Sequence, residues 1–270
     1  MKNKGVAIPY IIWMAIFVVL PLILICIYAF TNRAGELTLS NFASMHQFTA
    51  VFGRSFLLAA VATAICFLIG YPLAYFLSRE GPLVRKIATM LIMLPMWMNL
   101  LLRTYAWMSL LEDNGLINQF LSFLNLPTIH IMNTSAAVVL GMVYNYLPFM
   151  VLPILSVIEK IDPKVIEAAQ DLGANHIMTF RKVIFPLSLP GVLSGITMVF
   201  IPSVSTFALS RLLGGGKTML LGNLIEMQFL GTAYNPHLGS AIALVMMVIV
   251  LICMAVMNRF GEGGEGVAVL

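Results

Sequence analysis

The glycine-rich run Gly214-Gly215-Gly216-Lys217-Thr218 has residue types that could bind a nucleotide phosphate. A phosphate-binding loop follows the pattern G-x4-G-K-[ST], which requires a glycine five residues before Gly216. Arg211 occupies that position, and the run does not join a predicted strand to a helix, as such loops do. The sequence therefore predicts no nucleotide site here, and we interpret the run as a flexible loop.

Other residue types that perform chemistry are scattered along the chain. The four histidines, His46, His130, His176 and His237, have no spacing typical of metal ligands. The three cysteines lie far apart in apolar runs, where cysteine behaves as a small buried hydrophobic residue. No serine lies in a nucleophile-elbow motif. These patterns predict neither an enzyme nor a metal or cofactor site.

The composition indicates an integral membrane protein. Apolar residues make up 60% of the 270-residue chain and charged residues only 10%, and the mean hydropathy is +0.98. A soluble domain needs roughly 25% charged residues to keep its surface in water, so most of this surface must face lipid. The basic residues are not gathered in a patch, which argues against nucleic-acid binding despite a pI of about 9.0.

Six stretches are long and apolar enough to cross the bilayer as helices, because a span requires about 20 residues. They are residues 9–30, 55–77, 87–111, 134–158, 187–210 and 239–257. We therefore predict an all-α membrane protein with a six-helix domain over residues 9–260, a cytoplasmic N-terminus over residues 1–8 and a flexible glycine-rich tail over residues 261–270. The first span is too long for a signal-peptide core, and we expect it to be a retained anchor.

The distribution of Lys and Arg predicts the orientation. Ten of the fifteen basic residues fall in the N-terminus, the 78–86 and 159–186 loops and the C-terminal tail, four fall on the opposite side, and Arg103 lies within the third span. Basic residues concentrate on the cytoplasmic side of membrane proteins, so we expect both termini in the cytoplasm. The loop over residues 112–133 has no Lys or Arg and is expected outside.

Prolines interrupt the third, fourth and fifth spans, namely Pro95, Pro148, Pro153 and Pro202. A proline inside a membrane helix frees a carbonyl group, which neighbours, water or a passing molecule must satisfy. Two interpretations stay open at this point. The prolines either make packing kinks, or they mark spans that line a pathway through the membrane.

The segment over residues 159–186 is longer than the roughly 2–8 residues that suffice to join two antiparallel helices. Asp162 followed by Pro163 is typical of a helix start, and Gly173 of a helix end. Asn175 can cap a second short helix, which we expect Pro186 to end. The sequence thus predicts two short amphipathic helices joined at a glycine. This rigid elbow either accepts force from a partner protein or lies on lipid headgroups.

The elbow carries a motif. Glu167-Ala168-Ala169, followed after three residues by Gly173 and later by Leu189-Pro190, resembles the EAA loop of the permease subunits of ATP-binding-cassette (ABC) importers. Segments in other spans are similar to the spermidine/putrescine branch of that family, most of all to its B-type subunits. These segments are Tyr71-Pro72-Leu73-Ala74-Tyr75, Arg103-Thr104-Tyr105, Tyr146-Leu147-Pro148-Phe149 and residues 212–229.

The resemblance implies a type I ABC importer permease fold in a bacterial inner membrane, with the elbow as a cytoplasmic coupling helix. In this family the loop docks in a groove of the ATP-hydrolysing subunit, so Glu167, Ala168, Ala169 and Gly173 are the expected docking residues. The implied partners are a second permease of the C-type in a heterodimer, two copies of the ATPase subunit and an extracytoplasmic substrate-binding protein. ATP hydrolysis is expected in the separate subunit.

A polyamine would need groups in the pathway that favour a cation. Because no carboxylate lies deep in a span, aromatic faces are the candidates, and each gains about 0.5–2 kcal/mol from a cation over the ring. The expected pathway residues are Trp97, Tyr105, Glu112, Asp113, Tyr144, Tyr146, Phe207 and Glu226. Core packing of the aromatic residues, and a plain solvated loop at Glu112 and Asp113, stay open as alternatives.

Two other functions stay open. The same class of permease could carry another solute, such as iron, sulfate or another small ion, and Arg103 would favour an anion if it faced the pathway. We expect Arg103 instead to pair with helix carbonyls or with an acid of a partner subunit. A self-sufficient secondary transporter is the alternative from another class, although such proteins normally use intramembrane acids as proton relays.

Overall fold

In a computed structural model of the chain, the structure describes residues 8–231 and 233–262. Over these residues it is built of helices joined by turns, with one isolated antiparallel bridge between Thr31 and Leu37. This confirms the all-α prediction. The predicted cytoplasmic N-terminus (1–8) and flexible tail (261–270) lie almost wholly outside the described residues.

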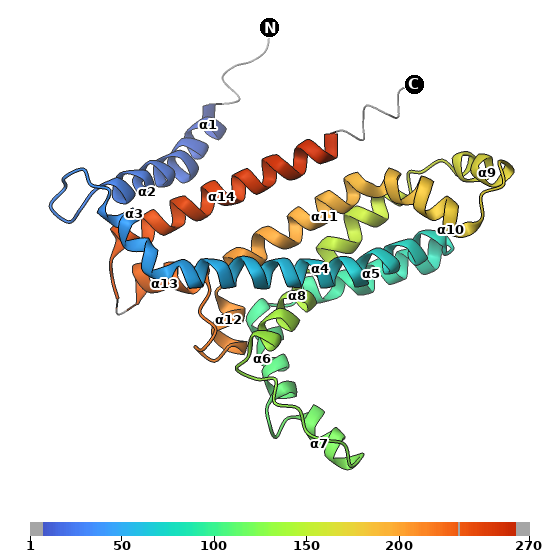
Figure 1. Ribbon diagram of the computed structural model, residues 1–270, viewed down its shortest axis with the longest axis horizontal. Coiled ribbons are helices and arrows are strands. Elements are labelled where there is room, and N and C mark those ends of the chain that lie inside the picture. Colours follow the sequence, from blue (N-terminus) through green and yellow to red (C-terminus); the bar gives the residue numbers. More distant parts are fainter. Residues whose placement is uncertain (1–7, 232, 263–270) are drawn as a thin grey trace, which may run out of the picture.

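The helices follow one another along the chain with short connections (Figure 1). In order they are α1 (Ile8–Met14), η2 (Ala15–Val19), α2 (Leu20–Phe30), α3 (Ser40–Ser44), η3 (Met45–Phe48), α4 (Thr49–Arg79), α5 (Pro82–Trp97), α6 (Leu100–Leu111), α7 (Leu116–Phe123), α8 (Ser135–Ile158), α9 (Pro163–Asp171), α10 (His176–Thr179), η4 (Phe180–Ile184), α11 (Phe185–Ser205), α12 (Ala208–Leu213), α13 (Leu221–Leu230) and α14 (Pro236–Glu262).

Five continuous helical stretches are long and apolar enough to cross a membrane. They are Ile8–Phe30, Ser40–Arg79, Ser135–Ile158, His176–Ser205 and Pro236–Met257. These stretches correspond to the first, second, fourth, fifth and sixth predicted spans. Two of them start well before the predicted bound: the second at Ser40 instead of residue 55, and the fifth at His176 instead of residue 187. The fifth also ends earlier than predicted, at Ser205 instead of Ser210.

The third predicted span, residues 87–111, is bent and consists of two helices instead of one continuous helix. The chain breaks after α5, and the segment Leu100–Phe123 continues at 94° to it. Pro95 weakens the helix before the break because it has no N–H to donate. Asn99 then starts α6, since its side-chain oxygen accepts a hydrogen bond from the Leu101 N–H at 2.8 Å.

The expectation that Pro186 ends a short helix was wrong. The backbone continues without interruption from α10 through the π-helical turn η4 into α11. The Phe185 N–H donates to the Phe180 carbonyl, a wider bond than that of an α-helix. Pro186 then lies in the first turn of α11, where its missing N–H and fixed φ are tolerated.

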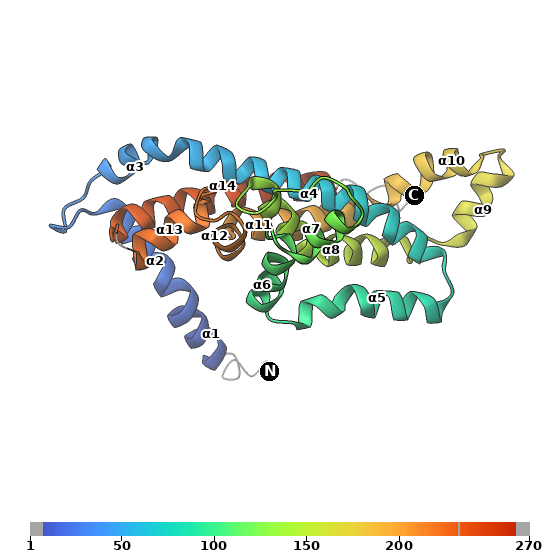
Figure 2. The same ribbon diagram turned by 90° about the horizontal axis from the view of Figure 1, so that it is seen from below.

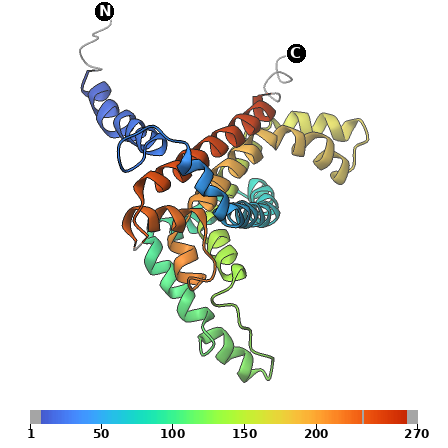
Figure 3. The ribbon, with the colours of Figure 1, turned by 60° about the vertical axis from the view of Figure 1, so that its left-hand side comes forward.

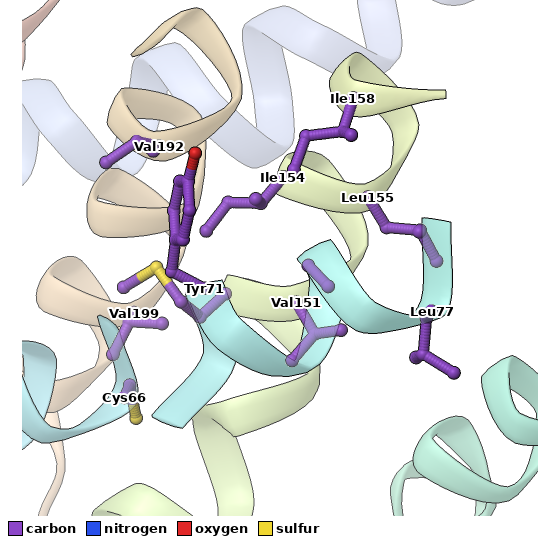
Figure 4. Close-up of a cluster of buried hydrophobic side chains, with 11 residues drawn as sticks. Cys66, Tyr71, Leu77, Val151, Ile154, Leu155, Ile158, Val192 and Val199 are labelled. Carbon is purple, nitrogen blue, oxygen red and sulfur yellow. The ribbon is translucent and has the colours of Figure 1, made fainter. Parts of the chain in front are cut away.

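The centre of the bundle is the packing of α4, α8 and α11. Their inner faces meet in a buried cluster that includes Tyr71 from α4, Ile154 from α8 and Val199 from α11 (Figure 4). Glycines let α11 approach α8 closely, because a Cβ added at Gly191 would lie 2.8 Å from the Pro153 carbonyl oxygen. Close approach at small residues is how membrane helices gain packing energy.

Three parts extend from this centre. The elbow, defined as α9, α10 and the turn between them, projects beyond one end of the long helices (Figure 1). The arm, defined as α6 and α7, leaves the bundle on another side (Figure 3). The first helix packs on α14 through α2, while α1 points away from the other helices (Figure 2).

Gly191→Ala is expected to lower the stability of the bundle by about 1–3 kcal/mol, because the new methyl group would overlap the α8 backbone. The measurement is the midpoint of thermal unfolding of the purified protein in detergent. Gly53→Ala on α4 is the matched control, since a Cβ there meets nothing within 4 Å. An equal fall in both variants would contradict the role assigned to close packing at Gly191.

Candidate functional site

The elbow has the local structure that its sequence predicts. The Asp162 carboxylate caps α9 by accepting from the Lys164 N–H at 2.9 Å, and the Asn175 side chain caps α10 by accepting from the Met178 N–H at 2.8 Å. Gly173 ends α9 with φ of +86°, a conformation that favours glycine. Its N–H donates to Gln170, and the next N–H donates to Ala169, which completes a Schellman motif.

The predicted docking residues lie together on the outside of the elbow. Glu167, Ala168 and Gly173 are exposed and Ala169 is half-buried. The apolar side chains beside them also face outward, with Leu172 90% and Ile177 71% exposed. The Glu167 carboxylate has no hydrogen bond or ion pair within the described part of the chain. The elbow therefore presents an apolar surface and a free carboxylate away from the bundle.

An aromatic joint of Tyr71, Tyr75, Phe180 and Phe185 ties the elbow to the bundle. The Phe180 ring, at the root of the elbow, lies 5.7 Å from the Tyr71 ring and 5.1 Å from the Tyr75 ring of α4, centre to centre, in edge-to-face geometry. The Tyr71 hydroxyl lies 2.8 Å from the Ser188 hydroxyl of α11. Edge-to-face pairs are favourable beyond the area they bury, so the joint connects the elbow to two spans.

Sequence reasoning missed this joint. The available signal was the spacing of Tyr71 and Tyr75, which places both rings on one face of a helix. Nothing in the local pattern around Phe180 indicates which span its ring touches. A second connection at the same end is the ion pair between Arg85 of α5 and Glu159, which follows α8, at 3.1 Å.

The predicted aromatic pathway residues fall into two groups. Trp97 at the end of α5, Tyr105 on α6 and Phe207 before α12 are exposed, by 72%, 52% and 48%. Tyr144 and Tyr146 of α8 are half-buried. The Tyr144 ring packs edge-to-face on Trp107 of α6 at 5.3 Å, and the Tyr146 hydroxyl donates to the Pro202 carbonyl at 3.5 Å. The structure thus brings α6, α8 and the end of α11 together at these tyrosines.

The predicted acidic pathway residues lie at two places. Glu112 and Asp113 follow α6 directly and are exposed, and Asp113 pairs with His130 at 2.7 Å. Glu226 lies on α13, in a short helix as expected, and pairs with Arg211 at 3.0 Å. This second pair lines a pocket of about 440 Å³ together with residues of the glycine-rich loop, among them Gly216 and Thr218.

A polar network holds the glycine-rich loop in place. The loop joins α12 to α13, two helices, as expected for a run that is not a phosphate-binding loop. The Asn223 side chain donates to the Phe207 carbonyl at 2.9 Å and accepts from the Ser210 hydroxyl. The Leu221 N–H donates to the Ser55 hydroxyl of α4 at 2.8 Å. Backbone groups freed where α11 ends are satisfied in this way.

Several known proteins are similar to this chain in amino-acid sequence. The profile of the family described as binding-protein-dependent transport system inner membrane component matches residues 67–262. The spermidine/putrescine transport system permease protein PotB of Haemophilus influenzae is 37% identical over 258 residues, which cover 92% of this chain and 90% of that protein. PotB of Escherichia coli K12 is 37% identical over 247 residues, which cover 88% and 90%.

Solved structures share the fold. A chain of a bacterial ABC transporter involved in the import of the acidic polysaccharide alginate matches with a TM-score of 0.82 and 18% identity, over 96% of this chain and 94% of that one. A chain of the MetNI methionine ABC transporter matches with a TM-score of 0.60 and 19% identity, over 82% and 98%. At these identities the likeness establishes the fold of an ABC importer permease.

The profile match covers most of the chain, and the relatives, which are named as transport system permeases, match over nearly its whole length. The five continuous apolar helices and the broken third span agree with a multi-pass protein of the inner membrane. The chain therefore belongs to the family of binding-protein-dependent transport system inner membrane components, and it is a transport permease with the ABC importer fold.

Proposed function

We propose that this chain is one permease subunit of an ATP-driven importer of polyamines of the spermidine and putrescine class. The observation that carries this proposal is the 37% identity to permeases named for that transport, over about nine-tenths of both chains. In this proposal residues 9–260 form the membrane domain and provide half of the pathway. A second, different permease provides the other half, and an extracytoplasmic binding protein delivers the solute.

The elbow is the docking site for a separate ATPase subunit, and two such subunits serve the two permeases. Its exposed Leu172 and Ile177 would otherwise remain in contact with water. A helix that lies on lipid headgroups usually carries basic residues on its polar face, whereas α9 carries Glu167 and Asp171 with a single basic residue, Lys164. A protein partner is thus a better fit to α9 than a lipid surface. The distribution of Lys and Arg supports a cytoplasmic elbow and cytoplasmic termini.

The connection of the elbow to the spans supports a mechanical role. α10, η4 and α11 are continuous, so a displacement of the elbow moves α11 with little bending. The aromatic joint carries the same displacement to α4. When the two ATPase subunits close on ATP, they favour the position of the elbow that fits their closed form. The pathway then shifts between its inward-facing and outward-facing states.

Aromatic rings and end-of-helix acids form the proposed route for the solute. Trp97, Tyr105 and Phe207 present exposed ring faces, and a cation gains about 0.5–2 kcal/mol over each such ring. That energy guides an ammonium group without trapping it. Glu112 and Asp113 at the end of α6, and Glu226 in its pocket, would attract the cation at the outer side.

The complete assembly in liposomes, with the second permease, the ATPase and the binding protein, is expected to accumulate radiolabelled spermidine when ATP is supplied. Unlabelled putrescine should compete, whereas sulfate and ferric iron should not. This chain alone in liposomes should show no uptake driven by a proton or sodium gradient, because its spans hold no acidic relay. Uptake by the chain alone would favour a secondary transporter, and ATP-driven uptake of sulfate or iron alone would favour the other cargoes.

The double variant Glu167→Arg with Gly173→Leu is expected to lower the amount of ATPase that co-purifies with the chain by at least about tenfold. Arginine at position 167 puts a positive charge where the docking surface has a negative one, so it repels any basic group of the ATPase that pairs with Glu167. Leucine at position 173 is strained by about 1–2 kcal/mol, because φ there is +86°. The matched control is Glu36→Arg with Gly35→Leu, which makes the same changes in an exposed turn where Gly35 has φ of +83°. Undiminished ATPase capture and transport in the elbow variant would contradict the docking role.

Phe180→Ala is expected to uncouple the assembly, because it removes the ring that joins the elbow to α4. The ATPase should still co-purify, but the solute imported per ATP hydrolysed should fall about tenfold or more. Phe67→Ala is the matched control, since Phe67 also packs on Tyr71 at 5.7 Å but lies on α4 itself. A ratio of solute to ATP that is unchanged in Phe180→Ala, or that falls equally in both variants, would exclude the transmission role of Phe180.

A further inference from the structure

Arg103 on α6 is a buried arginine whose donors lack acceptors. Only 8% of the residue is exposed, and its Nε and Nη1 atoms are buried with no hydrogen-bond partner in the described part of the chain. The expected pairing with helix carbonyls is therefore not formed at these atoms. A guanidinium stays charged at any physiological pH, and unpaired donors in a low-dielectric region are strongly unfavourable. The third nitrogen, Nη2, is not among the buried atoms and has no hydrogen bond within the described residues, so it is the part of the guanidinium that a group of another chain can reach.

The surroundings of Arg103 within the chain are neutral. Leu100 and Trp107, about one turn to either side on α6, pack in a buried cluster with Met142 and Tyr146 of α8. The elements packed against α6 are α7, α8 and α12. Their ionisable side chains are Tyr144, Tyr146 and Arg211, and Arg211 is already paired with Glu226.

The carboxylates of this chain are elsewhere. The described ion pairs join Arg85 to Glu159, His130 to Asp113 and Arg211 to Glu226, and no carboxylate in the described ranges lies within 4 Å of Arg103. Every described carboxylate side chain apart from that of Glu226 belongs to an exposed residue at a helix end, in the elbow or in a loop. The six spans contain no Asp or Glu at all.

The position of Arg103 points to a protein neighbour. α5 is 16 residues long and rises about 24 Å from its start, so α6 begins within the roughly 30 Å of hydrocarbon. The arm then leaves the bundle at 94° to α5 (Figures 1 and 3). Its outer side chains include Leu102, Tyr105 and Phe120, which are 66%, 52% and 63% exposed. Such an arm fits an apolar protein surface that supplies one anion.

We infer that a carboxylate on a membrane-spanning helix of the second permease subunit pairs with Arg103 and completes this site. The inference rests on the proposed function, because it requires that second subunit. A second copy of this chain has no carboxylate in its spans to contribute. The different, second permease of the proposed function is therefore the chain that supplies the carboxylate.

The test uses the complete assembly, captured from membranes through this chain, with the second permease measured per captured chain. Arg103→Met and Arg103→Gln remove the charge, and Arg103→Lys keeps it. At about pH 8 the neutral variants are expected to lose the second permease at least about tenfold, and the lysine variant less than about threefold. Arg33→Met, at an exposed arginine of the first loop, is the control and should lose none.

A series from about pH 8 to about pH 5.5 identifies the partner group. Without Arg103 the partner carboxylate is buried and unpaired, so it binds a proton as the pH falls and the second permease should return in the neutral variants. The titratable or charged side chains of the elements packed against α6 are Tyr144, Tyr146 and Arg211. His130 and Asp113 form a pair beyond the end of α6, and the unsubstituted chain, which contains the same pair, is the reference over the same series.

Several outcomes would overturn the inference. These are full capture of the second permease by the neutral variants at about pH 8, no return at low pH, or a return that depends on added phosphatidylglycerol, which would indicate a lipid phosphate. Capture of only a second copy of this chain would also overturn it. The ATPase content separates this site from the proposed function, because it should persist in the Arg103 variants and fall in the elbow variant.

Discussion

Hydrocarbon contains no water for a backbone group that has lost its helical partner, and this constraint explains the irregular parts of the chain. At the break after α5 the Asn99 side chain takes up a freed N–H group. Before Pro186 the helix widens into a π-turn instead of ending. Where α11 ends, the Asn223 amide binds the Phe207 carbonyl. At each irregular part, a nearby side chain or turn thus provides hydrogen bonds for the backbone groups.

The same requirement makes the centre of the bundle stiff. Helices that cannot gain from expelling water associate through close packing, and Gly191 and Gly195 bring α11 against the backbone of α8. The continuous helix from α10 to α11 and the Phe180 contacts with α4 extend that stiffness into the elbow. The elbow is thereby joined rigidly to the spans, which is what the proposed docking of an ATPase requires.

Charge is used sparingly and at defined places. The three described ion pairs join residues at helix ends or in loops, except that Glu226 lies within α13. Pairs that keep contact with solvent contribute about 0–1 kcal/mol each, so their effect is to set positions more than to stabilise. Arg103 is different because it is buried and its Nε and Nη1 have no hydrogen-bond partner among the described residues. The six predicted spans contain no Asp or Glu, and in the two proposals the ATPase supplies the energy and the second permease supplies the anion for Arg103.

The sequence by itself determined the features that depend on composition and on neighbouring residues. These were the membrane class, five of the six spans as continuous helices, and the elbow with its caps at Asp162 and Asn175 and its turn at Gly173, because a cap or a glycine turn involves residues only a few positions apart. Only the tertiary structure decided the direction of the arm after Asn99, the contact of Phe180 with Tyr71 and Tyr75, and the burial of Arg103. These features join residues that are distant in the sequence, and local patterns carry no information about which distant face a side chain will meet.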